Sequence, residues 1–197
     1  MSYASFIKRI LDIMLSLLLL LLFSWLVLFI VVVYLITFNF PILFSQPRIG
    51  KGGQSFVMFK FRTLNNSTAH LDERRFWLGD VLRFFSFDEL PQLWNVLRGE
   101  MSLIGPRPLP IEYFPLMDEA QRQRHSVRPG ITGLTQVNGR HEITWEKKFR
   151  LDQYYVEHVS FPLDTEVLIK TIFLLLSFRK DKSLAEEKFQ GSSSSVS

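Results

Sequence analysis

The stretch LLLLLLFSWLVLFIVVVYLI, residues 17–36, is apolar apart from one serine and one tyrosine. No charged residue lies between Asp12 and Arg48. About 20 consecutive apolar residues in a helix are enough to cross the hydrocarbon core of a bilayer. We therefore expect residues 1–40 to form a membrane-inserted helix.

A cleaved secretory signal is the alternative interpretation of this run. The run is longer than the usual apolar core of such a signal, and no small-residue cleavage site follows it. We expect the segment to remain on the protein.

Basic residues flank the apolar run on both sides. Lys8 and Arg9 precede it, and Arg48 follows it. Since basic flanks prefer the cytoplasm, a plain span would leave one flank on the wrong side. A helix that enters and returns would satisfy both flanks but needs a break, and Ser24 beside Trp25 is the one mid-run irregularity. Spanning and re-entrant paths both remain open, and we prefer the re-entrant one.

The composition favours anionic partners. The chain of 197 residues has a formal net charge of +4 and a pI near 9.4, which suits a lipid surface or phosphate groups. We expect no nucleic-acid partner, because no basic run is interleaved with aromatic residues. The absence of Cys excludes disulfides, thiolate catalysis and Cys-ligated zinc. The histidines show no metal-ligand spacing and are expected to be structural or on the surface; they are His70, His125, His141 and His158.

Beyond the apolar run, the patterning predicts an α+β domain, predominantly helical, over residues 41–180. Residues 181–197 form a polar tail whose end, from Gly191, is expected to be disordered. The expected elements are a strand at 56–62, a polar loop at 65–75, helices at 90–97, 118–125 and 145–158, and a loop at 129–133. The apolar residues 168–178 predict an interfacial helix, with a buried core helix as the alternative.

Two adjacent carboxylates stand out in SFDELPQL, residues 86–93. Ser86 and Glu89 fit a helix-capping box, but Pro91 would then lie inside the helix, where it is costly. A helix that starts near Glu89 or Leu90 places the proline in the first turn, and puts both carboxylates at the positive end of the helix dipole. An ionised Asp88 there can attack phosphorus, and Glu89 can hold Mg²⁺. Spacing alone leaves the structural and catalytic interpretations open.

Cationic residues near turns and element ends favour the catalytic interpretation. Guanidinium groups pair bidentately with phosphate oxygens, although each arginine alone could be a solvated surface charge. Residues 128–133, RPGITG, also resemble an anion-binding loop whose glycines let backbone amides approach a ligand. The candidates for phosphate or nucleotide binding are Lys60, Arg62, Arg83, Arg107, Arg128 and Arg140.

Four motifs in order carry a resemblance to a known family. They are KFRT (60–63), DELPQL (88–93), MSLIGPRPL (101–109) and RPGITGLTQVNGR (128–140). Together they resemble the bacterial sugar transferase family, the small monotopic polyprenyl-phosphate phosphoglycosyl transferases. The similarity extends from residue 8 to about residue 180 and is greatest to the branch that starts bacterial protein N-glycosylation with a bacillosamine-type sugar.

The resemblance implies a reaction, its participants and a location. A UDP-sugar, expected to be N-acetylated, would give its sugar phosphate to undecaprenyl phosphate and release UMP. Asp88 matches the family nucleophile, and Glu89 matches the ligand of the Mg²⁺ cofactor. Asp152 falls on another acidic family position whose role stays open. The catalytic domain would lie on the cytoplasmic face of the bacterial inner membrane, among membrane lipids, at the first membrane step of glycan assembly and before downstream glycosyltransferases.

One position departs from the family pattern. The family carries Ser-Pro midway along the membrane segment, where the proline breaks the helix; here Trp25 follows Ser24. Ser24 can still bend a helix by bonding back to a carbonyl.

Two other functions remain as alternatives. One is a hexose-1-phosphate transferase that initiates a capsule or O-antigen; such enzymes often carry extra N-terminal membrane helices, for which residues 1–8 leave no room. The other is a non-catalytic membrane-anchored scaffold with an anion-binding surface.

Overall fold

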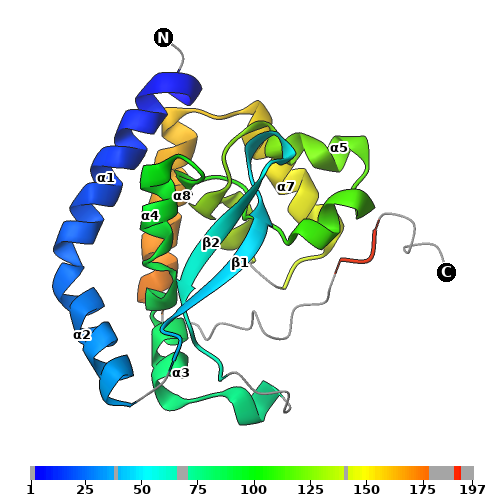
Figure 1. The fold of residues 1–197 in the computed structure, drawn as a ribbon. Coiled ribbons are helices and arrows are strands. Elements are labelled where there is room, and N and C mark those ends of the chain that lie inside the picture. The colour runs from blue at the N-terminus through cyan, green and yellow to red at the C-terminus, as the bar shows by residue number, and fades with distance from the viewer. Residues whose placement is uncertain (1–2, 38–39, 66–70, 140–141, 178–188, 192–197) are drawn as a thin grey trace.

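Helices surround two small β-sheets in the computed structural model (Figure 1), which confirms the predicted mixed, mainly helical fold. The model describes residues 3–37, 40–65, 71–139, 142–177 and 189–191. The α-helices there are α1 (Lys8–Leu22), α2 (Ser24–Ile36), α3 (Trp77–Phe84), α4 (Gln92–Arg98), α5 (Glu119–Arg122), α6 (Leu134–Val137), α7 (Trp145–Glu157) and α8 (Phe161–Leu176). The strands are β1 (Leu43–Ile49), β2 (Ser55–Phe61), β3 (Ser102–Ile104) and β4 (Gly130–Thr132).

The N-terminal apolar segment is a broken helix. Helices α1 and α2 meet at Phe23, where the backbone leaves helical geometry (φ −97°, ψ 8°), and their axes differ by 56°. Ser24 Oγ donates a hydrogen bond of 2.8 Å to the carbonyl of Leu21 across the break. This is the back-bonding that bends helices, so the expected irregularity at Ser24 is present without a proline. Within the described residues no single helix has the length and apolarity to cross a bilayer, whereas this bent pair does by length and composition.

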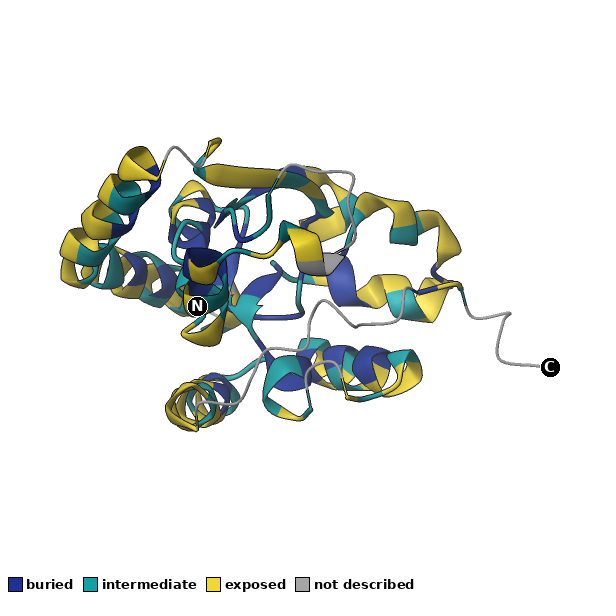
Figure 2. Cartoon of the chain, turned by 90° about the horizontal axis from the view of Figure 1, so that it is seen from below, coloured by how far each residue is buried: buried dark blue, intermediate teal, exposed yellow. Residues whose placement is uncertain are grey.

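The inner face of α1 is held to the rest of the protein by polar contacts. Asp12 is buried and accepts hydrogen bonds of 3.0 Å from both Ser102 Oγ and the Leu103 amide. Lys8 forms a 2.6 Å ion pair with Asp164 on α8. On the outer face leucines remain exposed, 75% in the case of Leu21. The helix therefore carries one anchored polar face and one exposed apolar face. Figure 2 shows buried and exposed residues side by side on the helices of the chain.

The hairpin of β1 and β2 carries one candidate site residue. Its strands pair antiparallel, and the turn at Lys51–Gly53 contains Gly52 at φ 67°. The buried Asn95 of α4 supports β2 because its Oδ1 accepts from the Phe59 amide at 3.1 Å and its Nδ2 donates to the Val57 carbonyl at 2.7 Å. This support places Lys60, the next residue along the strand, beside the start of α4.

The predicted loop at 129–133 is wrong, because Gly130–Thr132 is strand β4 and pairs parallel with β3. The Gly130 amide donates to the carbonyl of Pro106 at 2.9 Å, and the Gly105 amide donates to that of Thr132 at 2.8 Å. A Cβ on Gly130 would lie 2.1 Å from the Gly105 nitrogen. These glycines allow two backbone segments to approach each other, and the Gly130 amide is already paired, so it does not serve an anion-binding loop.

The later helices follow the sequence predictions closely. Asp118 caps α5 with a full capping box, a 3₁₀ turn continues it to Ser126, and α7 covers the predicted range. Helix α8 buries Val167 but exposes its apolar side chains, 69% for Phe173 and 62% for Leu176. This exposure is the pattern expected of an interfacial helix rather than a buried core helix. Residues 66–70 of the predicted 65–75 loop lie outside the described residues, as does most of the tail, and Leu71–Arg74 forms a 3₁₀ helix.

Candidate active site

The two adjacent carboxylates lie on a 3₁₀ turn, Phe87–Glu89, between α3 and α4. Ser86, just before the turn, has φ 58°, a left-handed conformation that is uncommon for a non-glycine residue. Helix α4 begins at Gln92, immediately after Pro91. The predicted helix start at Glu89 or Leu90 is therefore too early, and the carboxylates precede α4 instead of occupying its first turn.

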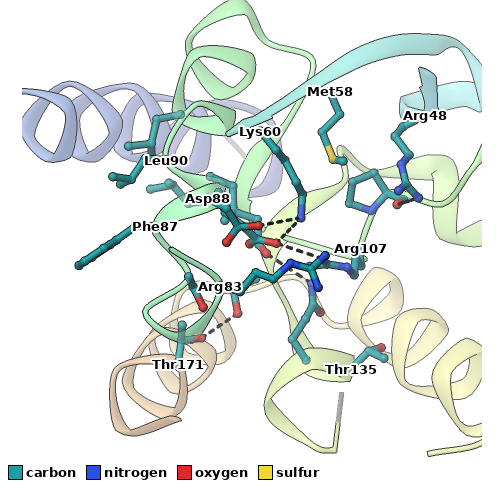
Figure 3. A pocket seen from close by; sticks show the side chains of 18 of the residues that line it. Arg48, Met58, Lys60, Arg83, Phe87, Asp88, Leu90, Arg107, Thr135 and Thr171 are labelled. Carbon is teal, nitrogen blue, oxygen red and sulfur yellow. Dashed lines mark hydrogen bonds and ion pairs between the residues drawn. The ribbon is translucent and has the colours of Figure 1, made fainter. Parts of the chain in front are cut away.

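Two cations from distant segments meet Glu89. Lys60 Nζ of β2 lies 2.8 Å from Glu89 Oε1, and Arg107 Nη2 lies 3.0 Å from the same oxygen. The Lys60 ammonium also lies 3.9 Å from Asp88 Oδ2. The carboxylates are largely shielded, with 13% of the Asp88 side chain and 18% of the Glu89 side chain exposed. Figure 3 shows Lys60 and Arg107 converging on this point.

The charge state of Glu89 follows from these contacts. Burial raises the pKa of its carboxyl group, but the charges and hydrogen bonds of Lys60 and Arg107 outweigh burial and lower the pKa to about 2. Glu89 is therefore ionised throughout the neutral range. Its negative charge is stabilised by these two cations.

Two further predicted cations line the same cavity. Arg83 Nε donates to Thr63 Oγ1 at 2.7 Å, which orients its guanidinium, and Arg62 Nε donates to the Pro41 carbonyl at 2.8 Å. Both line one cavity together with Lys60, Asp88 and Arg107.

The remaining two predicted cations are not placed with the carboxylates. Arg128 Nε donates to the Gly99 carbonyl at 2.8 Å, and Arg128 is not among the residues that line this cavity. Arg140 lies outside the described residues. Their expected roles in phosphate or nucleotide binding stay predictions.

The cavity has a volume of about 1020 Å³ and two chemically different walls. Its polar wall contains the carboxylates and their cations. Its apolar wall comes from α1 and α8, with the lining residues Leu15, Leu18, Leu19, Phe23, Leu168, Ile172 and Leu175. A ligand with a phosphate head and an apolar chain could place each part against a matching wall.

The carboxylates also suit a magnesium ion. No group of three or more His, Asp or Glu side chains gathers in the described residues in a way that could hold a metal by itself. Mg²⁺ commonly binds one or two carboxylates together with substrate phosphates and water, and Asp88 and Glu89 supply such a pair. Lys60 and Arg107 both contact Oε1 of Glu89, so neither of these contacts uses Oε2 of Glu89. The residues therefore fit Mg²⁺ bound jointly with a phosphate-bearing substrate.

Sequence reasoning missed one cavity residue, Arg124, and left open the role of Asp152. Arg124 is 4% exposed and forms a 2.7 Å ion pair with Asp152 Oδ2. Nothing in the linear pattern distinguishes Arg124 from its neighbours Arg122 and His125.

The histidines were expected to be structural or on the surface. His125 is buried and His158 is exposed, whereas His70 and His141 lie outside the described residues.

Comparisons with known proteins identify the family of this chain. The model of the family described as "Bacterial sugar transferase" matches residues 3–178. The uncharacterized sugar transferase EpsL of Bacillus subtilis is 43% identical over 94% of this chain and 96% of its own length.

Two similar enzymes are named for their reactions. The UDP-N-acetylgalactosamine-undecaprenyl-phosphate N-acetylgalactosaminephosphotransferase of Aeromonas hydrophila is 38% identical over 88% of this chain. The UDP-glucose:undecaprenyl-phosphate glucose-1-phosphate transferase of Klebsiella pneumoniae is 36% identical over 84%. The matched parts are 44% and 39% of those two longer proteins.

Proposed function

Since this chain belongs to the bacterial sugar transferase family, we propose that it moves a sugar 1-phosphate from a UDP-sugar to undecaprenyl phosphate and releases UMP. The chain is a sugar-phosphate transferase by family. The observation that carries the proposal is the pair Asp88 and Glu89 held under two cations in a cavity with one polar and one apolar wall.

The proposed chemistry has two displacements at one phosphorus. A carboxylate oxygen of Asp88 attacks the β-phosphorus of the UDP-sugar, and the bond from that phosphorus to the bridging oxygen breaks as UMP leaves with the electron pair. An oxygen of undecaprenyl phosphate then attacks the same phosphorus, and the bond to Asp88 breaks. The aspartate is regenerated as a carboxylate, and the lipid now carries a sugar diphosphate.

The neighbouring charges fit these steps. Phosphoryl transfer depends mainly on positioning and on neutralising charge. Lys60 and Arg107 lie where they can contact diphosphate oxygens close to Asp88. When bound at Glu89, Mg²⁺ would neutralise charge on the diphosphate and on the leaving UMP. Arg83, fixed by Thr63, supplies a further cation along the same wall.

The apolar wall and the exposed helices suit the lipid acceptor. We propose that α1 and α2 re-enter the bilayer at their 56° bend and that α8 lies at its surface. Residues 41–180 would then form the catalytic domain on the cytoplasmic face of the inner membrane. The prenyl chain could remain in the bilayer while its phosphate reaches Asp88 between α1 and α8.

The identity of the transferred sugar is a second, more specific proposal. We propose a UDP-linked N-acetylated sugar, of the bacillosamine type, as in protein glycosylation, where downstream glycosyltransferases extend it. An N-acetylated donor is also named for the Aeromonas relative. The Klebsiella relative, named for glucose, favours the hexose alternative instead. A panel of UDP-sugars with measured UMP release would distinguish them.

The decisive experiment compares Asp88→Asn with the intact chain in detergent, using undecaprenyl phosphate, Mg²⁺ and a radiolabelled UDP-sugar. The variant should neither release UMP nor retain the labelled sugar phosphate covalently. Asp80→Asn, which removes a half-exposed carboxylate paired with Arg75, is the matched control and should keep both signals. Full UMP release by Asp88→Asn would refute the mechanism, and no release by the intact chain across a broad panel would favour the scaffold alternative.

A further inference from the structure

A second polar cluster lines the same cavity and is not used by the chemistry above. At its centre is Arg124, on the 3₁₀ turn Gln123–Ser126. Its Nη2 pairs with Asp152 Oδ2 at 2.7 Å and donates to the backbone carbonyl of Arg107, also at 2.7 Å. Its Nε and Nη1 are buried and have no hydrogen-bond partner in the described structure. A side chain that is only 4% exposed thus presents two unused donors at a cavity wall.

The cluster also presents an unused acceptor. Thr135 Oγ1 donates to Asp152 Oδ1 at 2.8 Å, which fixes α6 against α7. The next residue, Gln136, also lines the cavity, and its buried Oε1 has no partner in the described structure. Buried polar groups in folded proteins are nearly always paired, so each exception requires an explanation. We name this cluster of Arg124, Thr135, Gln136 and Asp152 the Arg124 corner.

The charges of the Arg124 corner favour a neutral group over an anion. The Asp152 carboxylate already balances the Arg124 guanidinium. Lys148, the nearby buried lysine, places its ammonium 4.3 Å from the centre of the Trp145 ring. What remains is a set of two N–H donors and one carbonyl acceptor. A complementary ligand therefore carries carbonyl oxygens beside an N–H group on one edge.

The position of the Arg124 corner points to one part of the donor. Arg107 joins the two regions, because its guanidinium contacts Glu89 while its carbonyl is held by Arg124. Figure 3 shows Thr135 below Arg107 in this view, with Asp88 to the left of both. In phosphoryl transfer the attacking and leaving oxygens lie roughly in line through phosphorus. A leaving nucleotide that extends away from Asp88 past Arg107 would reach the Arg124 corner, which lines the same cavity.

We propose that the Arg124 corner binds the uracil ring of the leaving nucleotide, an inference that rests on the proposed function. The base edge offers the O2 and O4 carbonyls on either side of the N3–H group. One of the two unused Arg124 donors, Nε or Nη1, donates to a uracil carbonyl, and Gln136 Oε1 accepts from N3–H. Asp152 acts as a positioning residue that holds the guanidinium in place.

The test measures binding of UMP to the full chain in detergent by calorimetry, independently of turnover. Three probes separate the parts of the nucleotide: UMP, ribose 5-phosphate, which lacks the base, and UMP methylated at N3, which lacks the donated hydrogen. Gln136→Leu is the main variant, since Gln136 is only partly buried and the change leaves the Arg124–Asp152 pair intact. Arg122→Gln, a neighbouring arginine stacked on Phe114 outside the cavity lining, is the matched control.

Gln136→Leu should weaken UMP binding about fivefold to tenfold, the range of a single hydrogen bond, and leave ribose 5-phosphate binding unchanged. The intact chain should bind N3-methylated UMP more weakly than UMP, and Gln136→Leu should no longer distinguish the two. Arg124→Lys, which keeps the charge opposite Asp152 but loses the planar donors, should weaken UMP binding more than ribose 5-phosphate binding. Thermal unfolding of each variant reports whether it is folded.

Two results would overturn the inference. Equal UMP affinity in the intact chain and in folded Gln136→Leu would show that Gln136 does not contact the base. An equal loss for UMP and ribose 5-phosphate would show that the cluster acts on the phosphate instead. Neither result affects Asp88-dependent UMP release, which tests the proposed function separately.

Discussion

The Lys60 ammonium lies 2.8 Å from Glu89 Oε1 although the two residues are 29 positions apart in the chain. The contact joins strand β2 to the turn that precedes α4. Because the same nitrogen lies 3.9 Å from Asp88 Oδ2, one cation serves both carboxylates. It therefore places positive charge beside two adjacent carboxylates in a cavity that is largely shielded from water.

Replacing Lys60 with Met should lower kcat/KM for UMP release roughly 10²-fold to 10³-fold, the cost of losing one preorganised charge at a reacting phosphate. Without the lysine, burial would raise the pKa of Glu89 above its present value of about 2. The acid limb of the pH–rate profile should therefore move to higher pH. Steady-state assays between pH 4 and 8 measure both effects.

Lys51→Met is the control for this substitution, since Lys51 is exposed in the hairpin turn on the same pair of strands. It should leave the rate and the pH profile unchanged. A Lys60→Met enzyme with unaltered kcat/KM would show that the ammonium has no part in the reaction.

The bend at Phe23 predicts that both ends of the apolar segment lie on the same side of the membrane. The chain has no Cys, so a single introduced cysteine can be labelled uniquely. An impermeant maleimide added to inside-out vesicles should label Ser2→Cys and Gln54→Cys alike. In right-side-out vesicles neither should react.

A plain span would give the opposite result, with Ser2→Cys and Gln54→Cys labelled from opposite sides. Trp25→Pro provides the internal control, because a proline beside the existing break should leave the labelling pattern unchanged. Loss of re-entrance in Ser24→Leu would assign the bend to the hydrogen bond from Ser24 to Leu21.

The features that the sequence predicted well depend on local rules. The alternation in residues 56–62 predicted β2, and Gly99, at φ 84°, ends α4 where expected. The failed prediction at 129–133 has a tertiary cause. Strand β4 exists because Gly105 and Gly130 approach each other, and the residues between them in the sequence carry no sign of that approach.

The predictions of site residues also differ according to whether they depend on local sequence or on the packed fold. The motifs placed Lys60 and Arg107 among the candidate site residues, and in the structure both form ion pairs with Glu89. Arg124 was missed because its importance comes from burial against Asp152, which only the packed fold creates. Arg128 has the motif position of a ligand-binding residue, yet its Nε donates a hydrogen bond to the Gly99 carbonyl. Charge alone does not show which arginines face a cavity.

Gly130→Ala tests the close approach of the β3 and β4 segments. The added Cβ would lie 2.1 Å from the Gly105 nitrogen and 2.4 Å from the Thr132 oxygen, so backbone must move. We expect a loss of about 3 kcal/mol in the free energy of unfolding, typical of severe overpacking. Urea denaturation in detergent measures it. Gly52→Asn is the control, because open space surrounds Gly52 and asparagine tolerates its positive φ; equal stability of both variants would contradict the packing argument.

His125 should make the protein less stable in mild acid. Burial lowers the pKa of its imidazole, and the neighbouring charge of Arg124 lowers it further, to about 3. Between that value and the ordinary histidine pKa of 6.5, the unfolded state binds a proton that the folded state does not. The free energy of unfolding should therefore fall as the pH falls through this window, by about 1.4 kcal/mol per pH unit from this residue.

Comparing urea denaturation of the intact chain and of His125→Leu at pH 7, 6 and 5 isolates the contribution of His125. The leucine variant cannot bind the proton in either state, so its stability should depend less on pH by the amount above. His158→Gln, at an exposed histidine, should keep the steeper dependence of the intact chain. Equal dependence of stability on pH in the intact chain and in His125→Leu would show that His125 takes up its proton in the folded state. The contact with Phe114 would then not shield the imidazole from water.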